Sequence, residues 1–214
     1  MNKTTKKRIL CFGDSNTRGC IPGTTFKRFS EEIRFPKYLQ KLLGSNYEII
    51  EEGLNSRTLT SEYQRPNKEG KNGSTYLIPC LFSHDPLDLV ILMLGTTELK
   101  EEFHHAPETI GKLLDEHYAK VIPKIKSQAR NTYPKLLIIA PPIIDDQSAS
   151  PRYVGGTKKS KELSKIYSKI AKTNSCHFVD ASKLEVGSDG VHITEESHIK
   201  LAEILNKKIK SMKL

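Results

Sequence analysis

Short apolar runs alternate along this chain with longer segments whose apolar residues recur every three or four positions. A run that is apolar at consecutive positions, bounded by glycine or proline, is typical of a strand buried on both faces. Asp88 to Leu94, which is β-branched in its middle and is followed by Gly95, fits this pattern best. The chain therefore predicts five such strands, at residues 8–12, 47–50, 88–94, 135–140 and 176–179.

The segments between these runs have the periodicity of helices. Pro36 near the start and Gly44 past the end bound the first helix, as is usual for these two residue types. Thr194 is a natural N-cap for the last helix, whose apolar residues lie on one face. Further helices are predicted at residues 76–82, from 107 to about 130 with a kink at Pro123, and from 157 to about 174.

Strands that alternate with helices predict βαβ units, in which a parallel sheet lies between two layers of helices. We therefore expect a three-layer α/β/α sandwich with a five-stranded parallel sheet. One domain over residues 1–214 is expected, since neither a change in composition nor an internal repeat marks a boundary. Residues 55–74 have no period and predict a long functional loop. In such sheets, ligands bind beyond the carboxyl ends of the strands.

Composition narrows the class of protein. A chain of 214 residues, 36% of them apolar, has the size of one globular domain. No segment reaches the ~18 consecutive apolar residues of a membrane helix, and the N-terminus lacks the apolar stretch of a signal peptide. The cysteines form no C-x-x-C pair, so reduced thiols and a cytoplasmic location are expected; they are Cys11, Cys20, Cys80 and Cys176.

The net charge of +9 raises the question of a nucleic-acid partner. The lysines, however, are interleaved with glutamates on amphipathic patterns, and no aromatic residues accompany them. This distribution is typical of solvated helix faces. We therefore expect no nucleic-acid partner and no membrane partner.

A serine, a carboxylate and a histidine fall at the carboxyl ends of the predicted strands. Ser15 follows the first strand in Gly13-Asp14-Ser15, while Asp189 and His192 lie in the loop before the last helix. Serine is a weak nucleophile that needs an adjacent base, and the base needs a third group to orient it. Each motif alone is common in turns and helix caps. Their combination at one rim of the sheet favours nucleophilic catalysis.

These motifs resemble those of the SGNH or GDSL hydrolases, whose nucleophile lies in a Gly-Asp-Ser motif after the first strand. The likeness extends over essentially the whole chain and includes residues 52–58 and 94–96. The resemblance implies a flavodoxin-like SGNH fold, with Ser15 as nucleophile, His192 as general base and then acid, and Asp189 as its orienting partner. The arylesterase-like branch looks most similar; it acts on short acyl esters, uses no cofactor and often forms homo-oligomers.

Two positions depart from the family pattern, and both concern the oxyanion hole. Ser56 stands where the family usually has glycine, and Thr97 stands where it usually has the asparagine of a Gly-x-Asn-Asp motif. The backbone N–H of Ser56 can still donate. The threonine hydroxyl is shorter than the asparagine amide, and losing one such donor costs roughly 10²–10³ in rate. A slow hydrolase is therefore expected.

The sequence thus predicts a serine esterase that hydrolyses aryl, alkyl or acetylated sugar esters through an acyl-enzyme on Ser15. One alternative is a catalytically inactive binding protein on the same fold, motivated by Thr97. Another is a flavodoxin-like carrier, which would leave Asp189 and His192 without a role and would use a phosphate cradle of Ser15, Asn16, Thr17 and Gly19. No metal is expected, since His104 and His105 are adjacent and point to different faces.

Overall fold

The computed structural model describes residues 6–212 and 214. Its middle layer is a sheet of five parallel strands in the order β2-β1-β3-β4-β5. The strands are β1 (Lys7–Gly13), β2 (Tyr47–Gly53), β3 (Leu89–Met93), β4 (Lys135–Ala140) and β5 (His177–Asp180). All five residues of β3 are buried, which accounts for its uninterrupted apolar sequence. The predicted five-stranded parallel sheet is confirmed.

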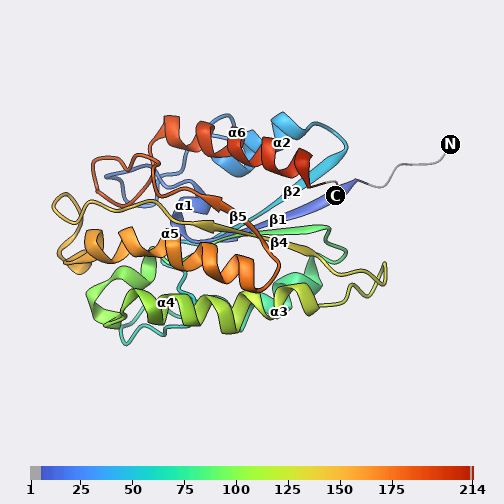
Figure 1. Ribbon diagram of the computed structural model, residues 1–214. Coiled ribbons are helices and arrows are strands. Elements are labelled where there is room, and N and C mark those ends of the chain that lie inside the picture. Colours follow the sequence, from blue (N-terminus) through green and yellow to red (C-terminus); the bar gives the residue numbers. More distant parts are fainter. Residues whose placement is uncertain (1–5, 213) are drawn as a thin grey trace.

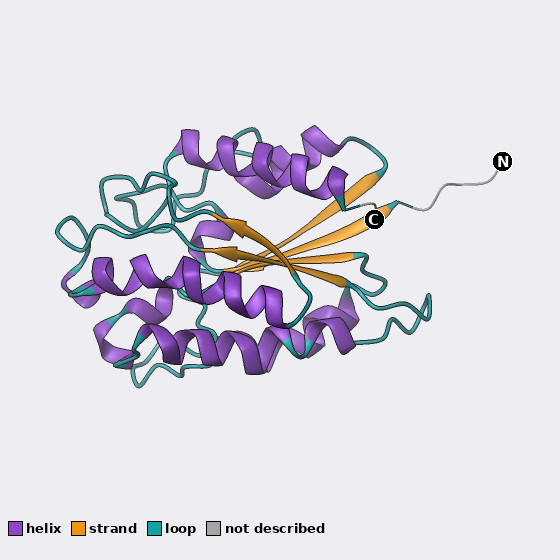
Figure 2. Ribbon diagram, viewed as in Figure 1, coloured by secondary structure: helices purple, strands orange, loops and turns teal. Residues whose placement is uncertain are grey.

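Helices cover both faces of this sheet (Figures 1 and 2). One face packs against α2 (Phe35–Leu43) and α6 (Glu195–Ser211), and the other against α3 (Gly73–Ser83), α4 (Pro107–Leu114) and α5 (Gly156–Thr173). Successive side chains of a strand face opposite sides of the sheet. Leu10 belongs to one buried cluster, and its neighbour Cys11 belongs to the other. The three-layer α/β/α sandwich predicted from the sequence is therefore confirmed.

Two local elements differ from the sequence prediction. Ser15–Arg18 forms a single helical turn, α1, where a polar loop was expected. The helix predicted to reach about residue 130 leaves α-helical geometry at Leu114. It continues as a π-turn at Asp115–Ala119 and a 3₁₀ turn at Ile122–Lys124, and ends there because Pro123 lacks the N–H that a longer helix needs. Short 3₁₀ turns also occur at Thr97–Leu99, Glu101–Phe103 and Pro151–Tyr153.

The register of the sheet brings the first three strand ends to one level. Gly13 pairs with Gly53 of β2 and with Met93 of β3. β2 lies on one side of β1, and β3 lies on the other. The strand order therefore switches at β1. A crevice at the carboxyl ends is expected at such a switch point.

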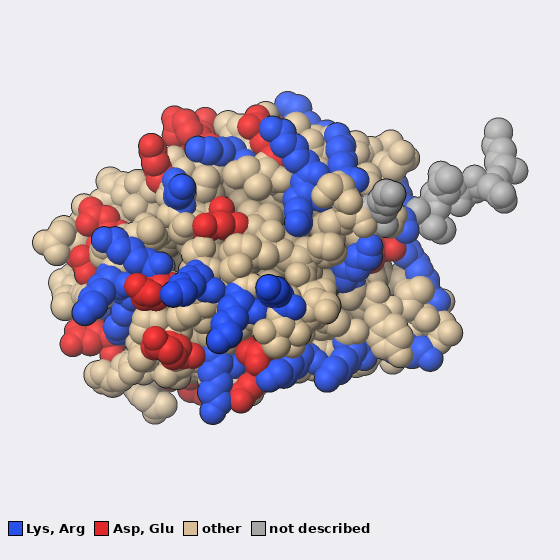
Figure 3. All heavy atoms as spheres, in the orientation of Figure 1, with Lys and Arg blue, Asp and Glu red and all other residues tan. Residues whose placement is uncertain are grey.

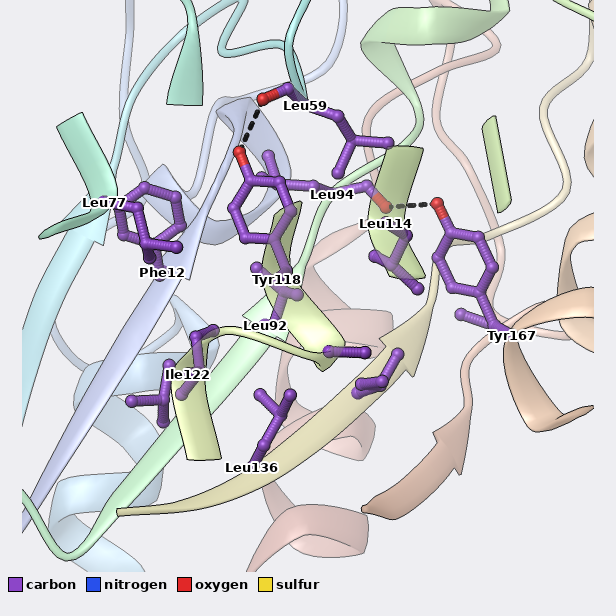
Figure 4. Packing of buried hydrophobic residues seen from close by; sticks show 14 of the residues in the cluster. Phe12, Leu59, Leu77, Leu92, Leu94, Leu114, Tyr118, Ile122, Leu136 and Tyr167 are labelled. Atoms are coloured by element: carbon purple, nitrogen blue, oxygen red, sulfur yellow. Dashed lines mark hydrogen bonds between the residues drawn. The ribbon is translucent and has the colours of Figure 1, made fainter. Parts of the chain in front are cut away.

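Two core tyrosines hold the loops that follow these strands (Figure 4). Tyr118 donates a hydrogen bond to the carbonyl of Leu59 at 2.6 Å, and Tyr167 donates one to the carbonyl of Leu94 at 3.0 Å. Both side chains are fully buried. Gly95 follows Leu94 with φ of 122°, and a Cβ there would clash with the Tyr167 hydroxyl, so only glycine fits this turn.

The charged residues lie on the outside of these layers. Figure 3 shows lysine and arginine side chains interspersed with aspartate and glutamate over the face that α5 and α6 cover. Every helix in the described part of the chain is too short or too polar to cross a bilayer.

Candidate active site

The three residues that the sequence singled out lie in hydrogen-bonding contact. Ser15 is the first residue of α1, and Asp189 and His192 lie in the loop before α6. His192 Nε2 is 2.8 Å from Ser15 Oγ, and His192 Nδ1 is 2.6 Å from Asp189 Oδ2. An ionised carboxylate only accepts, so Nδ1 carries the proton and Nε2 accepts from the Ser15 hydroxyl. The arrangement suits removal of the Ser15 proton.

Asp189 is fixed by its own loop and by the segment after α1. Its Oδ1 accepts backbone N–H bonds from Val191 at 3.0 Å and His192 at 2.9 Å, and its Oδ2 accepts one from Gly23 at 2.9 Å. Burial raises the pKa of Asp189, but the hydrogen bonds and charge of His192 outweigh burial and hold this pKa well below its usual range. The carboxylate therefore stays ionised while it orients the imidazole.

Asn16 connects the nucleophile turn to both neighbours of the histidine. Its Nδ2 donates to the Val191 carbonyl at 3.3 Å, and its Oδ1 accepts from the Ile193 N–H at 2.9 Å. The side chain is buried. Sequence analysis considered Asn16 only as part of a phosphate cradle, because nothing in its spacing relates it to positions 191 and 193.

Ser56 and Thr97 line the same cavity as Ser15 and His192, so the structure brings all five predicted site residues to one place. This cavity has a volume of about 470 Å³. Sequence analysis did not name the other lining residues individually as site residues; they are Cys20, Thr24, Thr25, Phe26, Asn55, Lys100, Ser150, Arg152 and Tyr153. Of these, Asn55 lies in the loop that the sequence predicted to be functional, and Ser150, Arg152 and Tyr153 lie in residues 140–156, which were also expected to shape the substrate sites.

Ser56 occupies a backbone conformation that favours glycine, with φ of 62°. Three contacts accompany this conformation. Its carbonyl accepts from the Tyr63 hydroxyl at 3.3 Å, its Oγ accepts from Lys68 Nζ at 3.2 Å, and the Leu54 N–H before it bonds to the Gly13 carbonyl at 3.1 Å. These contacts hold the loop in this conformation with serine at position 56.

Two buried carboxyl groups lie beneath the cavity. Asp14 caps α1 by accepting the Asn16 N–H at 2.9 Å, and burial raises its pKa to about 6. Glu98 is fully buried and accepts the Leu59 N–H, and burial raises its pKa to about 8. One oxygen of each group has no hydrogen-bond partner among the described residues. At neutral pH Glu98 is therefore mostly protonated.

One group of potential metal ligands occurs in the described part of the chain, where sequence analysis expected none. It comprises Glu52, Cys80 and His84, whose ligand atoms lie within 4.8 Å of one another. His84 Nε2 contacts Glu52 Oε1 at 2.9 Å, and Arg57 Nη2 lies 3.8 Å from Glu52 Oε2. Burial raises the pKa of Cys80 to about 12. Arg57 already compensates the carboxylate, and burial keeps the thiol protonated, which disfavours a cation.

Several known proteins that are similar to this chain are named as esterases. The aryl esterase of M. smegmatis is 35% identical, with a TM-score of 0.87 over 96% of this chain and 99% of that one. A carbohydrate acetylesterase from Sinorhizobium meliloti is 36% identical, with a TM-score of 0.87 over 97% of this chain and 100% of that one. An acetylxylan esterase of Xylanibacter ruminicola is 26% identical over 95% of this chain, which spans 43% of that relative's length.

The family comparison covers most of the chain. Residues 11–198 match the GDSL-like Lipase/Acylhydrolase family, a range that includes Ser15, Ser56, Thr97, Asp189 and His192. The resemblance found in the sequence is thereby confirmed. The chain belongs to the GDSL-like lipase/acylhydrolase family and is a carboxylic ester hydrolase of the SGNH type.

Proposed function

We propose that this protein is a serine esterase that cleaves short acyl esters through an acyl-enzyme on Ser15. The observation that carries the proposal is the hydrogen-bonded chain from Ser15 through His192 to Asp189, at the wall of a cavity that Ser56 and Thr97 also line. It supports catalysis over the two other functions considered. An inactive binding protein has no need of these hydrogen bonds. In a phosphate cradle, the Ser15 hydroxyl would bind the phosphate and would not be hydrogen-bonded to His192.

The reaction proceeds in two halves. Ser15 Oγ attacks the ester carbonyl while its proton passes to His192 Nε2, and Asp189 stabilises the imidazolium that forms. When the tetrahedral intermediate collapses, His192 gives this proton to the departing alcohol, and the acyl group stays on Ser15. Water then attacks the acyl-enzyme with His192 as base. The carboxylic acid leaves, and Ser15 recovers its proton.

The oxyanion of each intermediate needs donors next to Ser15. Ser15 begins α1, and the first N–H groups of a helix have no partner within it, so the Ser15 N–H can donate. The N–H of Ser56 and the hydroxyl of Thr97 complete the proposed hole. Aryl, alkyl and acetylated sugar esters are the proposed substrates, in keeping with the named activities of the relatives.

The proposal is tested with p-nitrophenyl acetate and a fluorophosphonate probe. The protein should release p-nitrophenol, one probe molecule should attach per chain, and the labelled protein should be inactive. Peptide mass spectrometry should locate the label on Ser15 and leave the exposed Ser148 of the same rim unlabelled. If the protein shows neither turnover nor labelling, or if the label lies on another residue, Ser15 is not the nucleophile.

A Thr97→Asn variant should raise kcat for p-nitrophenyl acetate by about tenfold, because an asparagine amide reaches farther than a threonine hydroxyl and one oxyanion donor is worth roughly 10²–10³ in rate. Thr97 is buried at the cavity wall, so the new amide faces the reacting groups. Thr97→Val serves as the matched control, since it keeps the shape and removes the hydroxyl. An unchanged or lower rate for Thr97→Asn, with a loss for Thr97→Val, would mean that the hydroxyl already fills this role.

A further inference from the structure

Cationic side chains gather beside the candidate active site. Lys100 and Arg152 line the cavity that contains Ser15. Lys68 adjoins this cavity, because its Nζ donates a hydrogen bond to Ser56 Oγ at 3.2 Å. A further arginine lies beside Lys68 and acts on its charge. We call the four side chains the cation cluster: Arg65, Lys68, Lys100 and Arg152.

Three members of the cluster surround one aromatic ring. Lys68 Nζ is 5.6 Å, Lys100 Nζ 5.1 Å and Arg65 Cζ 5.0 Å from the centre of the Tyr63 ring. Lys100 Nζ also donates a hydrogen bond to the Tyr63 hydroxyl at 2.8 Å. Contact with a ring face compensates part of the cost of each charge. The cations still repel one another, because a ring carries no net charge.

One carboxylate, Glu102, balances part of this charge at close range. Arg65 Nε lies 3.5 Å from Glu102 Oε2. Within the described residues, no carboxylate oxygen lies within 4.0 Å of a charged nitrogen of Lys68, Lys100 or Arg152. The cluster therefore has more positive than negative charge around the cavity.

The buried carboxyls beneath the cavity compensate Lys100 only at longer range. Asp14 and Glu98 both interact electrostatically with Lys100, but neither forms an ion pair with it. Glu98 is mostly protonated at neutral pH, since burial raises its pKa to about 8. Little compensation comes from it.

Lys100 is the member for which this lack of a partner costs most. The residue is 5% exposed, and burying an ammonium without a paired charge is unfavourable. Burial lowers the pKa of Lys100 to about 8; the charge of Glu102 opposes this change, and the charges of Lys68, Arg152 and Arg65 act in the same direction as burial. An anion in the cavity would pair with this ammonium and relieve the repulsion.

We propose that the substrate ester carries an anionic group, such as a carboxylate, on its acyl or its alcohol part, and that the cation cluster binds this group. The inference rests on the proposed function, since it places the anionic group in the cavity that contains Ser15. A volume of about 470 Å³ suits a small ester with the anionic group a few bonds from the scissile carbonyl. The cluster thereby selects among short esters by charge.

Two pairs of matched esters test the proposal. They also distinguish an anionic group on the alcohol part from one on the acyl part. For the alcohol part, 4-carboxyphenyl acetate is compared with the neutral 4-carbamoylphenyl acetate. For the acyl part, the mono-4-nitrophenyl ester of adipic acid is compared with 4-nitrophenyl hexanoate. We expect kcat/KM to favour the anionic member of at least one pair by about tenfold, as for one well-placed charge pair. Raising the salt concentration should shrink this ratio.

Variants of the cluster then locate the effect. Arg152→Gln changes an exposed side chain and Lys100→Met a buried one, and each should lower the anionic-to-neutral ratio of kcat/KM by about three- to tenfold. Lys210→Gln removes the same charge from the exposed end of α6 and should leave the ratio at its wild-type value.

The outcomes are distinguishable from those for the proposed function. If neutral esters are hydrolysed and neither pair favours its anionic member, the inference is wrong while the esterase stands. If the preference exists but Lys210→Gln lowers it as much as Arg152→Gln does, the overall charge of the protein is responsible and the cluster is not the site. If no ester of either kind is turned over and Ser15 is not labelled, the proposed function fails, and the inference fails with it.

Discussion

An Asp189→Asn variant should fold normally and lose about 10⁴-fold in kcat for p-nitrophenyl acetate, the loss known for the equivalent change in a serine protease. Asparagine can keep the acceptor contacts to the Val191 and His192 N–H groups through one oxygen. Its amide can instead donate toward His192 Nδ1, which would move the imidazole proton to Nε2. In that tautomer Nε2 no longer accepts from Ser15, so the base is lost while the packing remains.

The control for this variant is Asp180→Asn. Asp180 is an exposed carboxylate at the end of β5, on the same rim of the sheet, and it accepts the Ser182 N–H at 2.9 Å. Its replacement should leave kcat within about twofold of wild type, as is usual for a surface change. Thermal unfolding followed by circular dichroism checks that both variants fold. A loss below about tenfold for Asp189→Asn would contradict the assigned role, because orientation of the base would then come from elsewhere.

A Glu98→Gln variant should be more stable than wild type at alkaline pH. Burial raises the pKa of Glu98 from 4.5 to about 8 in the folded protein. Between these values the folded state keeps a proton that the unfolded state has released, so the free energy of unfolding falls as pH rises. Glutamine retains the oxygen that accepts the Leu59 N–H and never ionises. The two proteins should be similar at pH 5, and the variant should gain roughly 3–5 kcal/mol by pH 9.

Urea unfolding at pH 5, 7 and 9 measures this difference. Glu203→Gln is the matched control, since Glu203 is an exposed side chain of α6 and its replacement should leave the pH dependence as in wild type. A Glu98→Gln protein that follows the wild-type decline between pH 5 and 9 would show that Glu98 is not the group responsible.

The sequence predicted the architecture well because strands that are buried on both faces have uninterrupted apolar sequences. The five residues of β3 are apolar without interruption because helices cover both faces of the strand. Asp189 and His192 were found because they are three positions apart and meet within one loop. Ser15 joined them because parallel strands and the helices that return between them bring the chain back to the same rim.

Contacts between distant positions were not predictable in this way. Asn16 bonds to Val191 and Ile193, which lie 175 and 177 positions further along the chain, and no local pattern encodes such a pairing. Lys100 and Arg152 meet at the cavity through loops whose courses depend on the folded core. The end of α4 was missed because the apolar period continues past Leu114, where the backbone changes to wider and then tighter turns. Over so few residues, the apolar period does not distinguish an α-helical turn from a wider or tighter one.

Tyr118 and Tyr167 reach from the core to main-chain carbonyls, and their hydroxyls bond to Leu59 and Leu94 rather than to the two positions that depart from the family pattern. These two contacts to main-chain atoms hold the loop after β2 and the turn after β3 without using the side chains at 56 and 97. Chemistry and scaffold are separable here, because the tyrosines that hold these loops lie in the core while Ser56 and Thr97 line the cavity. For an engineer, the same separation makes these two positions the natural sites at which to diversify the enzyme.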